Sequence, residues 1–194
     1  MPCMIRWPGH IAPGSVSNEI VSGHDWFPTL MAAVGDPDVK DKLLKGYAVD
    51  GTTFKVHLDG YNQLPYLTGQ EPKSPRKGFV YFNDDGDVVA LRVENWKIVF
   101  EEQRTPGTML VWANPFTPLR VPKFFDLHAD PFERADITSN TYYDWAIQHS
   151  YVAYGAQALI AQFLETFKEF PPAQRPASFT IDQAMAKLKQ SFDD

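Results

Sequence analysis

Residues 79–101 carry the pattern that most constrains the fold of this chain. Strand-like runs rich in β-branched and aromatic residues follow one another at 79–82, 88–93 and 96–101. Asp85-Gly86 lies between the first two runs, and Asp-Gly between strand-like runs is a strong signal for a hairpin turn. The segment therefore predicts an antiparallel meander, and the apolar run at 123–127 predicts a fourth strand.

The last third of the chain is predicted to be helical. Apolar residues recur at helical spacing at Val152, Ala156, Leu159, Ile160, Phe163, Leu164 and Phe167, and Pro171-Pro172 ends the pattern. A face this wide must cover another layer, so we expect the helix to pack on the sheet. Thr180 and Gln183 form a capping box that predicts a second helix, with Ile181, Met185, Leu188 and Phe192 on one face.

The first part of the chain has a different character. The apolar run 3–7 ends at a Pro-Gly turn and predicts a buried strand, and the run 26–34 ends at Gly35 and predicts a helix. Glycine and proline are scattered through 36–78, which predicts an irregular connection with one helical turn near 64–67. A strand followed by a helix is half of an α/β unit, so the chain is expected to begin within such a domain.

Composition excludes several classes of protein. The 18 Lys and Arg against 24 Asp and Glu give a net charge of −6, which leaves no excess of cations for a phosphate backbone, so we expect no nucleic-acid partner. No uncharged apolar stretch reaches the ~20 residues that span a bilayer, so we expect no membrane span. A single cysteine excludes an internal disulfide framework and a cysteine zinc site.

The sequence offers no self-contained catalytic centre. The five histidines lie far apart, without the spacing that places two metal ligands on one helix face, and we expect no metal site. Cys3 lies in an apolar run, which is typical of an inert buried thiol. Asn83 to Asp87 places glycine wrongly for a calcium loop and is better explained as a hairpin turn. His57 and Asp59 could form an acid–base pair, although turn formation at Asp59-Gly60 is the simpler interpretation.

The long segment 103–122 is the place where a binding role is expected. Its prolines and glycine predict a loop between strands, and loops of this length in compact domains are usually functional or mobile. Arg can bind oxyanions with its forked donors, and Trp can stack on rings. The candidate substrate-binding residues are therefore Arg104, Trp112, Asn114 and Arg120, with a packed surface loop as the alternative.

Five groups of residues occur in the order of one family's motifs. They are Arg6-Trp7-Pro8-Gly9; Asp25-Trp26-Phe27-Pro28-Thr29-Leu30; Asp59-Gly60 with Leu64-Pro65-Tyr66-Leu67-Thr68-Gly69; Ala90-Leu91-Arg92 with Trp96-Lys97; and Phe125-Asp126-Leu127 with Asp130-Pro131, Glu133 and Asp136. Together they resemble the C-terminal portion of the type I, formylglycine-dependent sulfatases, in particular the bacterial arylsulfatase-like group of the alkaline phosphatase superfamily.

The resemblance implies an α+β chain. Residues 1–77 would be the C-terminal end of an alkaline-phosphatase-like α/β domain, and 78–194 a subdomain in which a small four-stranded antiparallel sheet packs on a long C-terminal helix. The family's nucleophile is formylglycine, made from Cys or Ser in a Cys/Ser-x-Pro-x-Arg motif, and calcium assists it. That motif is absent, since Met4 and Ile5 follow Cys3. We expect no catalytic residue and no cofactor in this chain, with calcium and formylglycine in the full-length enzyme.

Two functions follow as hypotheses. In the first, the chain is the C-terminal part of a sulfatase that hydrolyses sulfate esters when whole, and is inactive alone, as an expressed fragment or the product of a truncated or split gene. In the second, it is a non-catalytic interaction or dimerisation module. Its expected partner is the missing N-terminal sulfatase domain or a second copy, docked through exposed apolar surface around Ile5, Trp7 and the helix 26–34. The compartment stays open, periplasmic or cytoplasmic, because any signal peptide would lie upstream.

Overall fold

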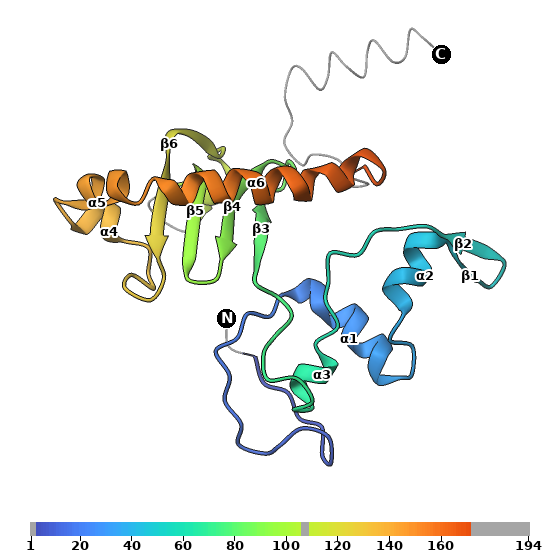
Figure 1. Cartoon of the computed structure of the whole chain (residues 1–194). Helices are drawn as coiled ribbons and strands as arrows, with labels where there is room; N and C mark the ends of the chain where they lie inside the picture. Colours follow the sequence, from blue (N-terminus) through green and yellow to red (C-terminus); the bar gives the residue numbers. More distant parts are fainter. Residues whose placement is uncertain (1–2, 106–108, 172–194) are drawn as a thin grey trace, which may run out of the picture. The chain divides into compact units, whose positions relative to one another are not determined.

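The computed structural model describes residues 3–105 and 109–171 (Figure 1). The described residues form two compact units that divide between Phe79 and Val80. The predicted helix at 180–192 lies outside the described residues.

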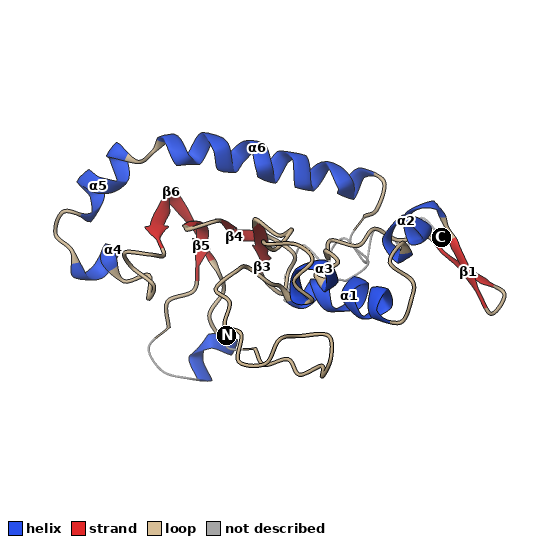
Figure 2. Ribbon diagram, turned by 60° about the horizontal axis from the view of Figure 1, so that its bottom comes forward, coloured by secondary structure: helices blue, strands red, loops and turns tan. Residues whose placement is uncertain are grey.

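The first unit holds short elements joined by long loops (Figure 2). Its elements are η1 (Gly23–Asp25), α1 (Trp26–Ala33), α2 (Val39–Lys45), β1 (Tyr47–Val49), β2 (Thr52–Phe54) and α3 (Leu64–Leu67). The predicted helix at 26–34 and the helical turn near 64–67 are confirmed as α1 and α3. Strands β1 and β2 form an antiparallel hairpin, with Tyr47 opposite Phe54.

Two predictions for the first unit are wrong. The run 3–7 forms no strand, and Cys3 is exposed, as is Met4 at 98%. An isolated strand leaves its backbone groups unpaired, and the described residues supply no partner strand for this run. The segment expected to be irregular contains α2 and the β1–β2 hairpin. Val39 and Leu43, one helical turn apart, are the buried residues that hold α2 in place.

The second unit is a four-stranded antiparallel sheet with a long helix packed on one face. Its strands are β3 (Gly78–Phe82), β4 (Val88–Val93), β5 (Trp96–Glu102) and β6 (Thr117–Asp126), in the spatial order β3-β4-β5-β6. Its helical elements are η2 (Met109–Trp112), α4 (Ala135–Thr138), α5 (Tyr142–Gln148), α6 (Tyr151–Glu165) and η3 (Thr166–Lys168). The predicted meander, the fourth strand and the long helix are confirmed, although β6 begins earlier than expected. The expected α+β class, a four-stranded antiparallel sheet packed on a long helix, is confirmed.

The core of this unit lies between the sheet and the helices α5 and α6 (Figure 1). Leu91 and Ile98 face each other across β4 and β5, and Ile98 also pairs with Phe124 of β6. Ala146 of α5 and Ala156 of α6 complete the cluster. Small side chains at these two positions let the helices approach the sheet closely. None of the helices that the structure describes is long and apolar enough to cross a membrane.

Candidate functional site

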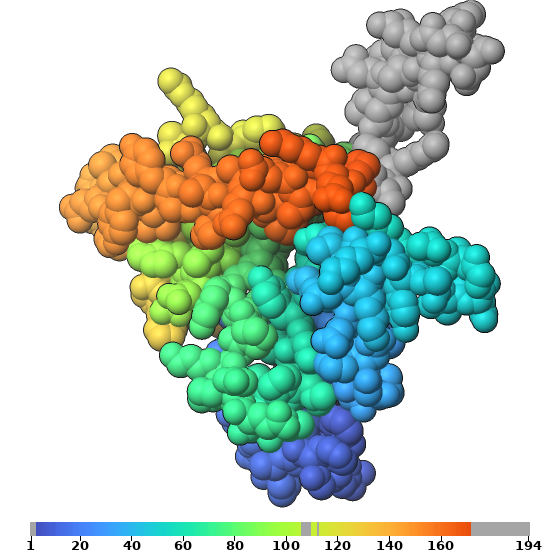
Figure 3. Space-filling model, turned by 45° about the vertical axis from the view of Figure 1, so that its right-hand side comes forward, coloured from blue at the N-terminus to red at the C-terminus, as the bar shows by residue number. Residues whose placement is uncertain are grey.

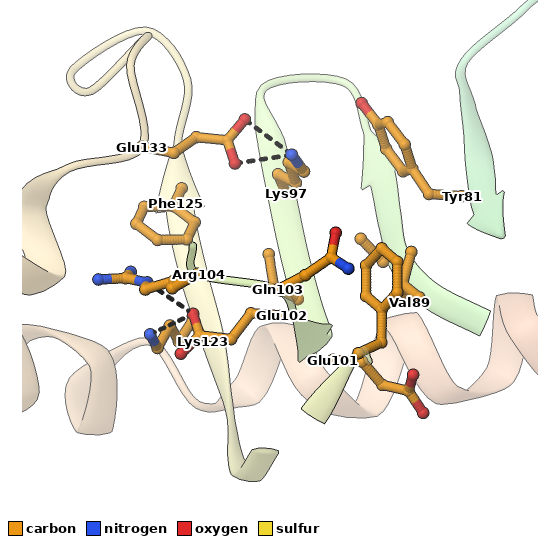
Figure 4. Close-up of a pocket in the computed structure, with 13 residues that line it drawn as sticks. Tyr81, Val89, Lys97, Glu101, Glu102, Gln103, Arg104, Lys123, Phe125 and Glu133 are labelled. Carbon is orange, nitrogen blue, oxygen red and sulfur yellow. Dashed lines mark hydrogen bonds and ion pairs between the residues drawn. The ribbon is translucent and has the colours of Figure 1, made fainter. Parts of the chain in front are cut away.

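A hollow of about 270 Å³ lies on the sheet of the second unit (Figure 4). Side chains alternate between the two faces of a strand, so Lys97 and Val99 lie on the face of β5 opposite to that of Ile98, which packs with Ala146 of α5 and Ala156 of α6. The hollow is therefore on the face opposite α5 and α6. Its lining residues are Tyr81, Val89, Ala90, Lys97, Val99, Glu101, Glu102, Gln103, Arg104, Phe116, Lys123, Phe125 and Glu133.

One side of the hollow is built around Lys97. Its ammonium group donates to both carboxylate oxygens of Glu133, at 2.6 and 2.8 Å, and lies 4.8 Å from the ring centroid of Tyr81. Burial raises the pKa of the Tyr81 hydroxyl. Glu133 has φ +54°, in the left-handed region that residues other than glycine rarely adopt. The residue with this uncommon backbone conformation is therefore the one whose carboxylate binds Lys97.

The other side is an ion-pair network of two cations and two carboxylates. Lys123 donates to Glu102 at 2.6 Å and lies 2.9 Å from Asp136, and Arg104 bridges the same two carboxylates. Burial lowers the pKa of Lys123, but its hydrogen bonds to Glu102 and Asp136 outweigh burial and hold that pKa above its ordinary value. The two positive and two negative charges of the network balance. The hollow is therefore lined by side chains of both charge signs and by the apolar side chains of Val89, Ala90 and Val99.

The four residues predicted for substrate binding differ in their position relative to the hollow. Arg104 lines the hollow, held by its two carboxylates, whereas Asn114 and Arg120 are not among the lining residues. The Asn114 amide donates to the carbonyl of Leu110 at 2.9 Å, and Arg120 is exposed on β6. Trp112 ends η2, but its side chain lies outside the described part of the structure. A substrate-binding role for these residues stays a prediction.

Sequence reasoning missed the ion pairs of the hollow. Lys97 and Glu133 are 36 residues apart, and Lys123 lies 21 residues from Glu102, so no local spacing reveals these contacts. The available signal was the group of motifs at 96–97 and 125–136, which contains Lys97, Glu133 and Asp136. These motif residues turn out to be ion-pair partners on the open face of the sheet.

The first unit contains a buried polar cluster centred on Asp25. The Arg76 guanidinium donates to its carboxylate through Nε at 2.8 Å and through Nη2 at 2.6 Å. The carboxylate also accepts the backbone N–H groups of Ser22 and Tyr61, both at 2.8 Å, and the Gln63 side chain at 3.1 Å. Burial raises the pKa of Asp25, but these hydrogen bonds, led by that of Arg76, outweigh it and hold the pKa below its ordinary value.

This cluster explains two of the sequence motifs. Thr29, from the segment 25–30, donates to the carbonyl of Asp25 at 2.6 Å and accepts the backbone N–H of Gln63 at 2.9 Å. Gly60 comes so close to η1 that an added Cβ would lie 2.0 Å from the carbonyl oxygen of His24. Asp25 is 0% exposed and Arg76 5%, so the cluster is closed to solvent and serves structure.

Two further kinds of site considered from the sequence are an acid–base pair at His57 and Asp59 and a metal site. His57 Nδ1 lies 3.2 Å from the Asp59 carboxylate, so the two side chains do meet, and their acid–base role stays a prediction. Among the described residues, no three His, Cys, Asp or Glu side chains gather in a way that could hold a metal ion.

The chain is similar in sequence to known sulfatases. The chain is 31% identical to human arylsulfatase A over 146 residues, which are 70% of this chain and 25% of that protein. The chain belongs to the sulfatase family. Bovine arylsulfatase A is 32% identical over 146 residues, and mouse steryl-sulfatase is 27% identical over 153 residues, or 71% of this chain and 22% of that sulfatase. No protein-family model matches the chain.

A solved sulfatase structure supports the fold. The PsFucS1 sulfatase from Pseudoalteromonas sp. aligns with a TM-score of 0.60 and 23% identity, covering 85% of this chain and 29% of that one. The chain therefore fits the C-terminal portion of a sulfatase and spans about a quarter of the length of the sulfatases that it matches.

Proposed function

We propose that this chain is the C-terminal part of a sulfatase that hydrolyses sulfate esters of the arylsulfatase type when it is complete. The observation that carries the proposal is the similarity to arylsulfatase A over 70% of the chain. The motifs that resemble the family's late motifs lie in the two units described above. In the first unit they build the Asp25 cluster, and in the second they build the sheet and its ion pairs.

The second part of the proposal is that the chain alone does not turn over sulfate esters. No Cys/Ser-x-Pro-x-Arg motif occurs in its 194 residues. No three His, Cys, Asp or Glu side chains gather among the described residues in a way that could hold a metal ion. The nucleophile and the metal of the intact enzyme would then come from residues outside this sequence. The part played by this chain is to form the sheet and helices that complete the enzyme's fold.

Within the intact enzyme, the proposed contribution to substrate binding is a contact from the loop and strand that follow β5. Two carboxylates already neutralise Arg104, so its affinity for a sulfate group is reduced. Arg120 is exposed, and no ion pair engages it among the described residues. Of the four predicted residues, Arg120 is therefore the cation that is more available to an anionic substrate.

The decisive experiment reads the DNA upstream of the Met1 codon. An open frame that encodes Cys/Ser-x-Pro-x-Arg establishes the sulfatase reading, and the extended protein should hydrolyse 4-nitrophenyl sulfate in the presence of calcium. The 194-residue chain should show no turnover above buffer, and clear turnover would refute its proposed inactivity. Replacing the motif Cys or Ser by Ala in the extended protein is the matched control and should abolish turnover.

A specific observation favours the second hypothesis, a non-catalytic interaction module. Helix α1 exposes Phe27 at 50%, Leu30 at 61% and Val34, just past its end, at 79%, and this spacing places them along one side. Ile5 is 41% exposed as well. An apolar stripe of this kind is suited to docking against the rest of an α/β domain. A stop codon and a ribosome-binding site just before Met1 would make this the leading function.

A further inference from the structure

Helix α6 is a surface helix without the charges that surface helices usually carry. Residues 145–164 contain no Asp, Glu, Lys or Arg, although the chain as a whole has 42 such residues among 194. Glu165 is the first charged residue of α6 and also its last residue. An amphipathic helix of a globular protein normally turns charged and polar groups to solvent. The sequence of α6 is instead that of a helix covered on both sides.

The structure shows which side of α6 is covered. Val152, Ala156 and Ile160 recur at four-residue spacing and pack into the core of the second unit. On the opposite side lie Tyr151, Tyr154 and Ala158, of which the two tyrosines are 63% and 75% exposed. Figures 1 and 3 show α6 lying along the outside of the sheet. We call the exposed residues Tyr151, Tyr154, Gly155 and Ala158 the tyrosine face.

The composition of the tyrosine face is that of a protein interface. Tyrosine is enriched at interfaces and in binding hot spots, because it supplies a large apolar surface with a polar end. Gly155 and Ala158 lie beside the tyrosines, and the missing side chain of Gly155 and the methyl group of Ala158 allow another helix to approach closely. The preceding helix α5 likewise exposes Tyr143 at 66% and Ile147 at 71%, one turn apart.

The available area is appropriate for a stable dimer. An aromatic side chain covers about 150–250 Å² when buried. Three tyrosines that are each about two-thirds exposed therefore offer on the order of 300–500 Å². A standard interface uses about 800 Å² per partner, and Ile147, Ala158 and Leu159 add to the tyrosine contribution. Tyr143, Tyr151 and Tyr154 together supply roughly half of the area that a dimer needs.

Charge favours a second copy of this chain as the occupant. The chain carries a net charge of −6, so two copies repel each other wherever acidic surfaces meet. A two-fold interface places the same patch against itself, which is unfavourable for a patch of one charge sign and acceptable for an uncharged one. The tyrosine face is uncharged.

We propose that the tyrosine face of α6, flanked by α5, is a two-fold interface through which two copies of this chain associate. The two α6 helices would cross near Ala158, the middle residue of a helix that runs from Tyr151 to Glu165. This inference does not depend on the proposed sulfatase function, because oligomeric state and turnover are measured separately. It also uses a surface different from the α1 stripe.

The first test measures the molar mass of the 194-residue chain by light scattering after size exclusion, over a dilution series. We expect a dimer that dissociates on dilution. Tyr154→Arg should raise the dissociation constant at least tenfold, because each dimer would contain two buried and opposed guanidinium groups. Leu30→Arg on the α1 stripe is the matched control and should leave the dissociation constant unchanged. Unchanged circular dichroism shows that each variant is folded.

The second test uses the single cysteine of the chain. In the double variant Cys3→Ser, Ala158→Cys, a residue at the two-fold axis meets its own copy, so oxidation should give a disulfide-linked dimer. In Cys3→Ser, Gln157→Cys the new thiol is also exposed but points about 100° away around the helix, and it should remain mostly unlinked.

Several outcomes would overturn the proposal. A monomer throughout the dilution series does so, as does a dimer that Leu30→Arg disrupts and Tyr154→Arg leaves intact. The 194-residue chain could also be a monomer while a shortened chain that ends at Pro171 forms a dimer. That result would show that residues 172–194 occupy the tyrosine face. Sedimentation of the monomer with phosphatidylglycerol vesicles, lost in Tyr154→Arg, would assign the face to a lipid surface instead.

Discussion

The hydroxyl of Tyr142 forms hydrogen bonds with both backbone polar groups of Phe124. The N–H of Phe124 donates to the hydroxyl oxygen at 3.0 Å, and the hydroxyl donates to the carbonyl of Phe124 at 3.1 Å. Phe124 lies in β6, the last strand in the order of the sheet, so no further strand in the described structure pairs with its outer edge. One side chain of α5 therefore takes the place that a neighbouring strand would fill.

Tyr142→Phe should destabilise the second unit by about 1–3 kcal/mol, because it leaves two buried backbone groups without their partner. The ring is retained, so the loss reports on the hydrogen bonds and not on packing. The measurement is urea unfolding of the chain followed by tryptophan fluorescence. Tyr143→Phe is the control, since Tyr143 is 66% exposed and its loss should stay within about 0.5 kcal/mol. Equal effects of the two variants would contradict the assignment.

The parts of the fold that the sequence predicted are those with a local signal. The hairpin turn at Asp85-Gly86 and the apolar spacing of α6 each depend on residues close in the chain, and both are confirmed. The parts that were missed have weak local signals. Helix α2 buries only Val39 and Leu43, so its seven residues resemble a charged loop. The apolar run at 3–7 lacked the partner strand that its pattern requires.

The candidate site was less predictable than the fold, for a related reason. Arg104 was proposed as a binding residue because it belongs to a long loop, but its ion-pair partner Asp136 is 32 residues away and was not identified as such. Arg76, which holds Asp25, was not identified at all, because 51 residues separate them. Long-range ion pairs are set by topology, and a single sequence contains no spacing that reveals them.

Arg76→Met should cost about 3–5 kcal/mol of unfolding free energy, because it leaves the buried Asp25 carboxylate without its counter-ion. Arg76→Lys should cost less, since the charge is kept while the forked contact is lost. The exposed Arg120 provides the control, and Arg120→Met should change stability by less than about 0.5 kcal/mol. Urea unfolding at pH 7 measures all three, and a small loss in Arg76→Met would show that the ion pair contributes little.

Gly60→Ala should be strongly destabilising, because the new Cβ would meet the backbone carbonyl of His24 at 2.0 Å and a backbone atom cannot rotate away. We expect a loss of about 1–3 kcal/mol, or more if η1 cannot shift. Gly23→Ala is the matched control, since nothing lies within 4 Å of its Cβ position. Thermal unfolding of the two variants compares them directly, and similar melting temperatures would refute the proposed close contact.

The Asp25 cluster should also make stability depend on pH. The pKa of Asp25 is lowered in the folded chain, so the unfolded state binds more protons between the folded pKa and the unfolded value of about 3.9. The contribution of the ionised carboxylate is therefore fully present above about pH 4 and is lost as pH falls through the lower, folded pKa.

The measurement is the difference in unfolding free energy between the wild-type chain and Asp25→Asn, taken from pH 7 down to pH 2.5. Other carboxylates titrate in both proteins and cancel in this difference. We expect a large, constant difference above about pH 4 that shrinks at lower pH, because the wild-type Asp25 becomes protonated and resembles the neutral amide. Gly23→Ala, which removes no titrating group, should differ from wild type by an amount that does not change with pH. A difference between wild type and Asp25→Asn that stays constant to pH 2.5 would show that the ionised carboxylate does not stabilise the first unit.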